Sequence, residues 1–301
     1  MTLWKGRVSP LARSIRCAPL LAAFVSFSAP LLAQSNSHHY SIRKPVEKYG
    51  TLKQGDVPGF GAVACGPVSV INSFVYLQNQ YPHVYDSKLI LKNPQGATEY
   101  DDWAYSAWVL GTQYMYTNSC GTLDPNFAWG KQRYISTYAP RTTILHGQAT
   151  EVDWSTAVGQ NPKRRPAWMN EMVPTWGFLY EELRRCQDVE IGLIFGGGGG
   201  HWLTLTGFDW MDDGDGIIQQ MENATIWFID PDDGMESSSS IWQDPMQGFR
   251  LTTNYGGGGG LPSWINIVAA ESPVPEPTVV AFAFAGGIGF VLVVARRRRA
   301  T

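Results

Sequence analysis

One cysteine, one histidine and one aspartate stand where they could carry out acyl transfer. Cys65 ends a glycine-rich loop in GFGAVACGPVSV. His201 follows five glycines in GGGGGHWLTLTGFDW, and Asp230 ends the apolar run TIWFID. A thiol is a nucleophile, an imidazole can take its proton, and a carboxylate can hold the imidazole in one tautomer. The three residue types therefore predict a triad in which Cys65 attacks a carbonyl group.

A helix is expected to begin at Cys65. Val68, Ile71 and Val75 recur at helical spacing, and Pro67 suits a first helical turn, where its missing N–H costs nothing. Unpaired N–H groups at a helix N-terminus favour an anion, so a thiol placed there forms the reactive thiolate more readily. Taken alone, the segment also fits a small buried residue that begins a core helix.

Three predicted strands and a short helix surround the other two residues. The patterns predict a helix near 176–183 and strands near 189–194, 201–208 and 225–229. The last two strands are natural antiparallel neighbours across the acidic loop 211–224, so His201 and Asp230 are expected at the same end of the pair. The glycines before His201 are expected to leave a cleft open and to act as a hinge. A histidine that merely begins a strand is the alternative.

Taken in order, these segments resemble the papain-like cysteine peptidases, and most closely the bacterial group related to the double-glycine leader peptidases. The resemblance covers about residues 50–235 and rests on four pieces: Cys65-Gly66-Pro67 opening a helix, the 176–195 segment, the strand 201–209, and Asp230-Pro231. It implies an α+β fold, in which a helix bearing the cysteine lies on an antiparallel sheet bearing the histidine and the aspartate. It also implies that Cys65 is the nucleophile, His201 its general base and later acid, and Asp230 the residue that orients His201.

The same family places a glutamine before the cysteine, and its side-chain amide joins the cysteine N–H in an oxyanion hole. Gln54 is the local candidate in this sequence. It lies eleven residues before Cys65, farther than is usual in the family. The intervening loop must therefore fold back if Gln54 is to take this role.

The resemblance implies a peptidase that hydrolyses peptide or amide bonds of a peptide or protein substrate. Two alternatives stay open: a catalytically inactive surface protein that binds peptide or exopolysaccharide, and an amidase or transglutaminase on the same triad. No cofactor and no metal are expected. The acidic loop fits part of a calcium-binding pattern, but Met211 stands at its first ligand position, and no Cys/His pair has zinc-ligand spacing.

The first 33 residues have the layout of a secretory signal peptide. Lys5, Arg7, Arg13 and Arg16 form a basic leader, and the apolar stretch 18–33 ends in a small residue. We expect cleavage by signal peptidase after Ala33. A retained anchor is the alternative, although the apolar run is shorter than the ~20 residues that a membrane span requires.

Residues 274–301 resemble the PEP-CTERM sorting signal of exopolysaccharide-producing Gram-negative bacteria. Pro275-Glu276-Pro277 precedes 18 uncharged residues, 278–295, and the four arginines 296–299. As a helix, the uncharged segment would nearly span a hydrocarbon core of ~30 Å. The resemblance implies an exosortase partner, a transient inner-membrane anchor with the domain on the periplasmic side, and later delivery to the envelope or the exterior. A simple C-terminal anchor is the alternative.

The body between these segments, 34–273, is predicted to be one large domain. It carries 15 basic and 25 acidic residues, a formal charge of −10, which argues against nucleic acid as its partner. Its three cysteines are Cys65, Cys120 and Cys186. An exported protein would bring this odd number into an oxidising compartment, so at least one thiol stays unpaired. A Cys120–Cys186 disulfide is left open, and Cys65 is expected to be free.

Overall fold

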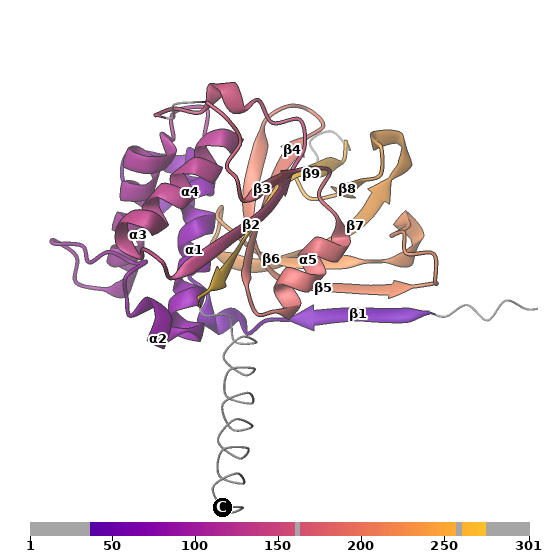
Figure 1. Ribbon diagram of the computed structural model, residues 1–301, viewed down its shortest axis with the longest axis horizontal. Coiled ribbons are helices and arrows are strands. Elements are labelled where there is room, and N and C mark those ends of the chain that lie inside the picture. Colours follow the sequence, from indigo (N-terminus) through magenta and orange to yellow (C-terminus); the bar gives the residue numbers. More distant parts are fainter. Residues whose placement is uncertain (1–36, 160–162, 257–260, 275–301) are drawn as a thin grey trace, which may run out of the picture. The chain divides into compact units, whose positions relative to one another are not determined.

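A computed structural model describes residues 37–159, 163–256 and 261–274. This part of the chain is α+β, with α1, α3 and α4 on one side of the sheet and α5 apart from them (Figure 1). The predicted signal peptide, 1–33, lies outside the described residues. So do the Pro-Glu-Pro triplet, the predicted span 278–295 and the arginines 296–299. None of the described helices is long and apolar enough to cross a membrane.

The α-helices are α1 (Cys65–Gln80), α2 (Pro82–Tyr85), α3 (Glu99–Val109), α4 (Asp124–Tyr138) and α5 (Trp176–Arg184). A π-helical segment, η4 (Leu110–Met115), continues α3. The 3-10 turns are η1 (Val46–Lys48), η2 (Gln54–Asp56), η3 (Gly61–Val63), η5 (Trp154–Thr156), η6 (Gln220–Glu222) and η7 (Pro245–Gln247). The helices predicted at Cys65 and near 176–183 are thus confirmed as α1 and α5. Helix α5 starts where the Thr175 hydroxyl accepts a hydrogen bond from the backbone N–H of Phe178.

The strands are β1 (His38–Arg43), β2 (Thr143–Ala149), β3 (Met169–Glu171), β4 (Asp188–Phe195), β5 (Gly200–Asp212), β6 (Thr225–Asp230), β7 (Met235–Asp244), β8 (Arg250–Thr253) and β9 (Ser263–Pro273). Strands β4 to β9 pair in sequence order, and β9 pairs back with β4, so these six antiparallel strands form a closed ring. Strand β1 pairs with the far half of β5, β2 pairs with β9, and β3 runs parallel to β2.

The three strands predicted around His201 are confirmed as β4, β5 and β6. Strands β5 and β6 are antiparallel, with Thr204 opposite Ile229, so the first residues of β5 lie beside the last residues of β6. The glycine run between β4 and β5 forms a hairpin turn, in which the N–H of Phe195 donates to the carbonyl of Gly199 at 3.1 Å. It therefore joins two directly paired strands and is not a linker between separate parts.

Two apolar clusters hold the helices and strands together. One lies between helices α1, α3 and α4 and the sheet, and the other contains side chains of the ring and of α5. The second and third residues after the start of β5 point to different clusters, because neighbouring side chains of a strand lie on opposite faces. Trp202 stacks on Phe127 of α4, with ring centroids 3.5 Å apart, whereas Leu203 belongs to the cluster of the ring. The start of β5 is thereby fixed against the helices as well as within the sheet.

Candidate active site

Cys65 is the first residue of α1, and its residue surface is 8 % exposed. The N–H groups of a first helical turn have no partner within the helix, so they surround the thiol with positive ends of dipoles. The helix start also lies tightly against the segment before α4. A Cβ atom on Gly66 would come within 2.8 Å of the Thr122 Cβ atom. The glycine after Cys65 is therefore required by this close approach.

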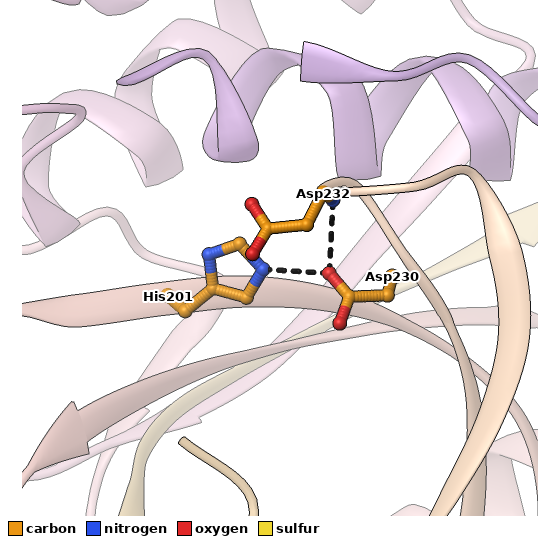
Figure 2. Close-up of side chains that lie close together, drawn as sticks. All are labelled: His201, Asp230 and Asp232. Atoms are coloured by element: carbon orange, nitrogen blue, oxygen red, sulfur yellow. Dashed lines mark hydrogen bonds and ion pairs between the residues drawn. The ribbon is translucent and has the colours of Figure 1, made fainter. Parts of the chain in front are cut away.

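His201 is the second residue of β5 and lies against the end of β6. Its Nε2 atom is 3.0 Å from Oδ1 of Asp230, and both residues are buried (Figure 2). Cys65 and His201 line the same cavity, and the Cys65 side chain interacts with the imidazole closely enough to raise its pKa. Because Asp230 occupies Nε2, Nδ1 is the ring nitrogen left for the thiol. The structure thus brings together the three residues that the sequence singled out.

The protonated form of His201 is strongly favoured. Burial lowers the pKa of the imidazole, but the hydrogen bonds and negative charges of Asp230 and Cys65 outweigh burial and raise the pKa to about 10. For Asp230, burial raises the pKa, but hydrogen bonds from His201, Tyr255 and the Asp232 backbone lower it below its usual value. An imidazolium held by a carboxylate and placed beside a cysteine can serve as the counter-ion of a thiolate.

Two residues that sequence reasoning missed complete the surroundings of Asp230. The backbone N–H of Asp232 donates to Oδ1 at 2.9 Å (Figure 2), and the hydroxyl of Tyr255 donates to Oδ2. The Tyr255 ring also lies over His201, with ring centroids 5.9 Å apart and planes 24° apart. Asp232 could have been found from the acidic turn DPDDG that follows β6. Tyr255 stands two strands later, and no local pattern points to it.

Gln54 lies against the turn after β6 and is not among the residues that line the cavity beside Cys65, so its place in an oxyanion hole stays a prediction. Its backbone N–H donates to the carbonyl of Pro231 at 2.7 Å, which folds the loop before α1 onto the turn after β6. Its side-chain Nε2 donates to Oδ1 of Asp232, and its Oε1 is buried without a hydrogen-bond partner among the described residues. One of the two amide N–H bonds of Gln54 is therefore engaged by Asp232.

A cavity of about 440 Å³ opens beside Cys65 and His201. Its lining comes from the segments 120–125, 151–156, 192–194 and 199–202 and from Asn266, with gaps at some positions. Gly199 and Gly200 line it without side chains, so the cavity stays open next to His201. This agrees with the expectation that the glycines leave a cleft free, while their action as a hinge stays a prediction.

Cys120 and Cys186 are both exposed free thiols, so no disulfide joins them. Cys120 lines the cavity, and Cys65 is free as expected. Among the described residues, three groups of side chains bring possible metal-ligand atoms together. They are His201, Asp230 and Asp232; Asp212, Asp213 and Asp215 of the acidic loop; and the buried Asp188, Glu190 and Glu271. The first two groups have hydrogen-bond partners within the protein: Asp230 binds His201, and Asp212 accepts backbone N–H groups of Gly214 and Gly216. The expectation that the site works without a metal stays a prediction.

Comparison with known proteins identifies no family for this chain. The chain matches no known protein-family model, and no curated protein matches it. What the site can do therefore rests on its own residues: a thiol at a helix N-terminus, an imidazole that lines the same cavity, and a carboxylate that holds the imidazole.

Proposed function

We propose that this chain is an exported cysteine peptidase of the papain-like type, which hydrolyses peptide or amide bonds. The observation that carries the proposal is the grouping of Cys65, His201 and Asp230: His201 is hydrogen-bonded to Asp230 and lines an open cavity together with Cys65, which lies at the start of α1. Such a grouping supplies a nucleophile, a proton carrier and a group that holds the carrier in one orientation.

In the first half of the proposed reaction, His201 holds the thiol proton of Cys65 and the thiolate attacks the substrate carbonyl carbon. The carbonyl oxygen becomes an oxyanion, which the N–H of Cys65 and the second amide N–H of Gln54 would stabilise. When the C–N bond breaks, His201 gives its proton to the leaving amine. The acyl group then remains on Cys65 as a thioester.

In the second half, water attacks the thioester carbonyl and His201 takes a proton from that water. The C–S bond breaks, the carboxylic acid leaves, and the proton returns to the Cys65–His201 pair. Asp230 keeps the imidazole in the orientation that both halves need. An amidase would follow the same steps on a side-chain amide, and a transglutaminase would replace the attacking water by an amine.

Alkylation of Cys65 by iodoacetamide tests the proposal in the full chain, with each modified thiol identified by mass spectrometry. Cys186 is an exposed thiol of the same molecule and lies outside the residues that line the cavity, so it serves as the internal reference. We expect Cys65 to react at least about tenfold faster than Cys186 near pH 6, where an ordinary thiol is protonated.

The variant His201→Ala should lower the Cys65 rate by about tenfold or more, because the thiolate loses its counter-ion. His83→Ala, which removes an exposed histidine from α2, is the matched control and should leave the rate unchanged. A Cys65 rate no higher than that of Cys186, and equal in the two histidine variants, would contradict the proposal.

The second candidate is an inactive member of the same fold that binds peptide or exopolysaccharide. The contact between the Gln54 amide and Asp232 favours it, because an amide held by a carboxylate is less available to an oxyanion. A reactive Cys65 that forms no thioester with any peptide of a mixed library, in wild type and in Asp232→Asn alike, would support the inactive member.

Export and sorting are a separate part of the proposal, with signal peptidase and an exosortase as partners. They rest on the basic and apolar leader and on the Pro-Glu-Pro, apolar and arginine segments of the C-terminus. Mass spectrometry of the chain recovered from outside an exosortase-bearing cell should find an N-terminus after Ala33 and a C-terminus near Pro277. An intact C-terminus in the exported protein would contradict the sorting proposal and leave the peptidase proposal untouched.

A further inference from the structure

The cavity beside Cys65 is acidic. Its lining includes the carboxylates of Asp124, Glu151 and Asp153, and none of its described lining residues is a lysine or an arginine. Two of these carboxylates have partners of their own. Glu151 pairs with Arg250, and Asp153 accepts hydrogen bonds from the backbone and hydroxyl of Ser155. Asp124 is the remaining carboxylate.

Asp124 begins α4 and is held in place by the sheet. Its Oδ2 atom accepts a hydrogen bond from Nδ2 of Asn266 at 2.6 Å. Asn266 belongs to β9, lines the same cavity and is 2 % exposed. Its own Oδ1 atom is buried and has no hydrogen-bond partner among the described residues. The hydrogen bond thus matches one acceptor of Asp124 with one donor of Asn266 and leaves the buried Oδ1 atom of Asn266 without a partner among the described residues.

The Asp124 side chain is half-buried but lacks a cationic partner among the described residues. Burial raises its pKa to about 6, and the hydrogen bond from Asn266 only partly opposes this. Within the described part of the chain, no lysine, arginine or histidine forms an ion pair with Asp124. A cationic group of a ligand that entered the cavity would supply the missing charge.

The rest of the cavity wall suits the stem of a long basic side chain. Leu123, Val152, Leu193 and Trp202 line it together with glycines. A lysine or arginine side chain has an apolar stem and a charged head, so it can lie along such a wall while its head reaches a carboxylate. The volume of about 440 Å³ falls within the range of ordinary ligand pockets.

We propose that Asp124, oriented by Asn266, is a specificity residue that binds a positively charged group of the substrate next to the bond that Cys65 attacks. The cationic group is the side chain of a lysine or arginine or the free amino end of a peptide. This inference rests on the proposed peptidase function. It adds that the substrate is basic at this position, which nothing in the triad itself requires.

Charged thiol reagents test the inference without a known substrate. In the full chain with Cys17→Ser, Cys120→Ser and Cys186→Ser, Cys65 is modified by ethylammonium methanethiosulfonate or by its ethylsulfonate counterpart. The Cys65 sulfur forms a disulfide with either reagent, and methanesulfinate leaves. The ratio of the two rates, divided by the ratio for free glutathione, measures the preference of the cavity for a cation. We expect Asp124→Asn to lower this ratio by about tenfold, because one half-buried negative charge is removed.

Glu181→Gln is the matched control, because it removes the same charge from the exposed surface of α5. It should change the ratio by less than about twofold, since exposed charges are screened by salt. Asp124→Ser provides a second variant, and thermal unfolding shows whether each variant is folded. If folded Asp124→Asn and Asp124→Ser keep the wild-type ratio, the subsite is overturned. If neither reagent reacts with Cys65 in the wild-type protein, the peptidase proposal is overturned instead.

A second measurement separates the two sources of the cation. The chloromethyl ketones of acetyl-lysine, acetyl-norleucine and unblocked norleucine all alkylate a reactive thiol, with loss of chloride. A faster reaction of the acetyl-lysine reagent assigns the subsite to a basic side chain, and a faster reaction of unblocked norleucine assigns it to an amino terminus. Either preference should disappear in Asp124→Asn. Equal rates of all three reagents with wild type would contradict both assignments.

Discussion

Both carboxylate oxygens of Asp230 are engaged, and Tyr255 binds the one that faces away from His201. Tyr255→Phe removes that hydrogen bond to the charged carboxylate and leaves the ring over the imidazole. The pKa of Asp230 should then rise towards its usual value, so the pair with His201 weakens at a higher pH. We expect the acid limb of the pH profile of Cys65 alkylation to move up by roughly one pH unit.

Tyr180→Phe on α5 removes a hydroxyl from a tyrosine that does not contact Asp230 and is the control. A purely structural role of Tyr255 would lower the unfolding temperature without moving the pH profile. An unmoved profile in Tyr255→Phe would therefore contradict its role as a positioning residue.

The protonated state of His201 should make the stability of the fold depend on pH. The pKa of His201 in the folded protein is about 10, above its usual value near 6.5. Because this pKa is raised on folding, the stabilisation that protonated His201 gives to the fold is complete below about pH 6.5. It is lost as the pH rises through the pKa of His201 in the folded protein. Relative to His201→Gln, the wild-type free energy of unfolding should fall by on the order of 3 kcal/mol between about pH 6.5 and 10.

Urea unfolding of both proteins at several pH values measures this difference. His83→Gln is the control for the loss of an exposed histidine. A wild-type advantage over His201→Gln that stays constant across the range, or grows towards alkaline pH, would show that His201 is not held as an imidazolium.

The residues that the sequence alone could place are those with a local signature. Cys65 precedes a helix-starting proline, His201 begins an alternating strand, and Asp230 ends an apolar one. Tyr255 has no such mark, because it meets Asp230 only after β7 and β8 have brought the chain back. Asp124 looks like an ordinary first-turn acid of a helix, and only the neighbouring Asn266 of β9 sets it apart.

At the scale of elements, the position of α1 depends on the absence of a side chain at Gly66. Gly66→Ala would bring a methyl group within 2.8 Å of the Thr122 Cβ and Oγ1 atoms. Either α1 or the segment 120–125 must then shift, and such overpacking usually costs about 1–3 kcal/mol. Since Cys65 is the adjacent residue, its alkylation rate should fall as well.

Gly177→Ala is a matched test of the same substitution near the start of α5, where a Cβ atom meets nothing within 4 Å. It should stabilise the protein by about 0.5–1 kcal/mol, because alanine loses less entropy in a helix than glycine. Urea unfolding compares the two variants. Equal changes in the free energy of unfolding would contradict the close approach at Gly66.

Strand β4 shows why its surroundings could not be predicted from its pattern. Asp188 and Glu190 alternate with Val189 and Ile191, a pattern typical of a strand with one solvated face. All four residues are buried, because β4 lies in the closed ring with its other face covered by the helices. Ring closure depends on the pairing of β9 with β4, some 75 residues apart, and no local pattern encodes such a pairing.

For the molecule as a whole, a buried charge cluster joins the helices to the sheet. Lys131 of α4 is fully buried, and its Nζ atom contacts Glu190 of β4 and Glu271 of β9. The carboxylate of Asp188 lies within 4.8 Å of both acids. Burial lowers the pKa of Lys131, but the charges of Glu190 and Glu271 outweigh this and raise it. One cation therefore serves three carboxylates that come from two strands.

Lys131→Met should destabilise the protein most at alkaline pH. Burial raises the pKa of Glu190 to about 8 and that of Asp188 to about 7 even with the lysine present. Acids with raised pKa values favour folding at low pH, and this advantage is lost as the pH rises through those values. Without Lys131, no lysine that contacts Glu190 and Glu271 opposes the loss, and only the charge of Lys44 still acts on Asp188. We expect a decrease of about 3–5 kcal/mol in the free energy of unfolding near pH 8.

Near pH 5 the three acids hold their protons, so the same substitution should lower the free energy of unfolding by less than half as much. The difference between the losses at the two pH values is what distinguishes a role of charge from a role of packing. Urea unfolding at both values measures it, with Lys92→Met as the control, since Lys92 pairs with Asp102 from a position that is largely in solvent. A cost of Lys131→Met that is equal at both pH values would mean that the lysine acts only through its apolar stem. A cost that grows with pH would show that charge holds α4 to β4 and β9, and with α4 the carboxylate of Asp124 at its first residue.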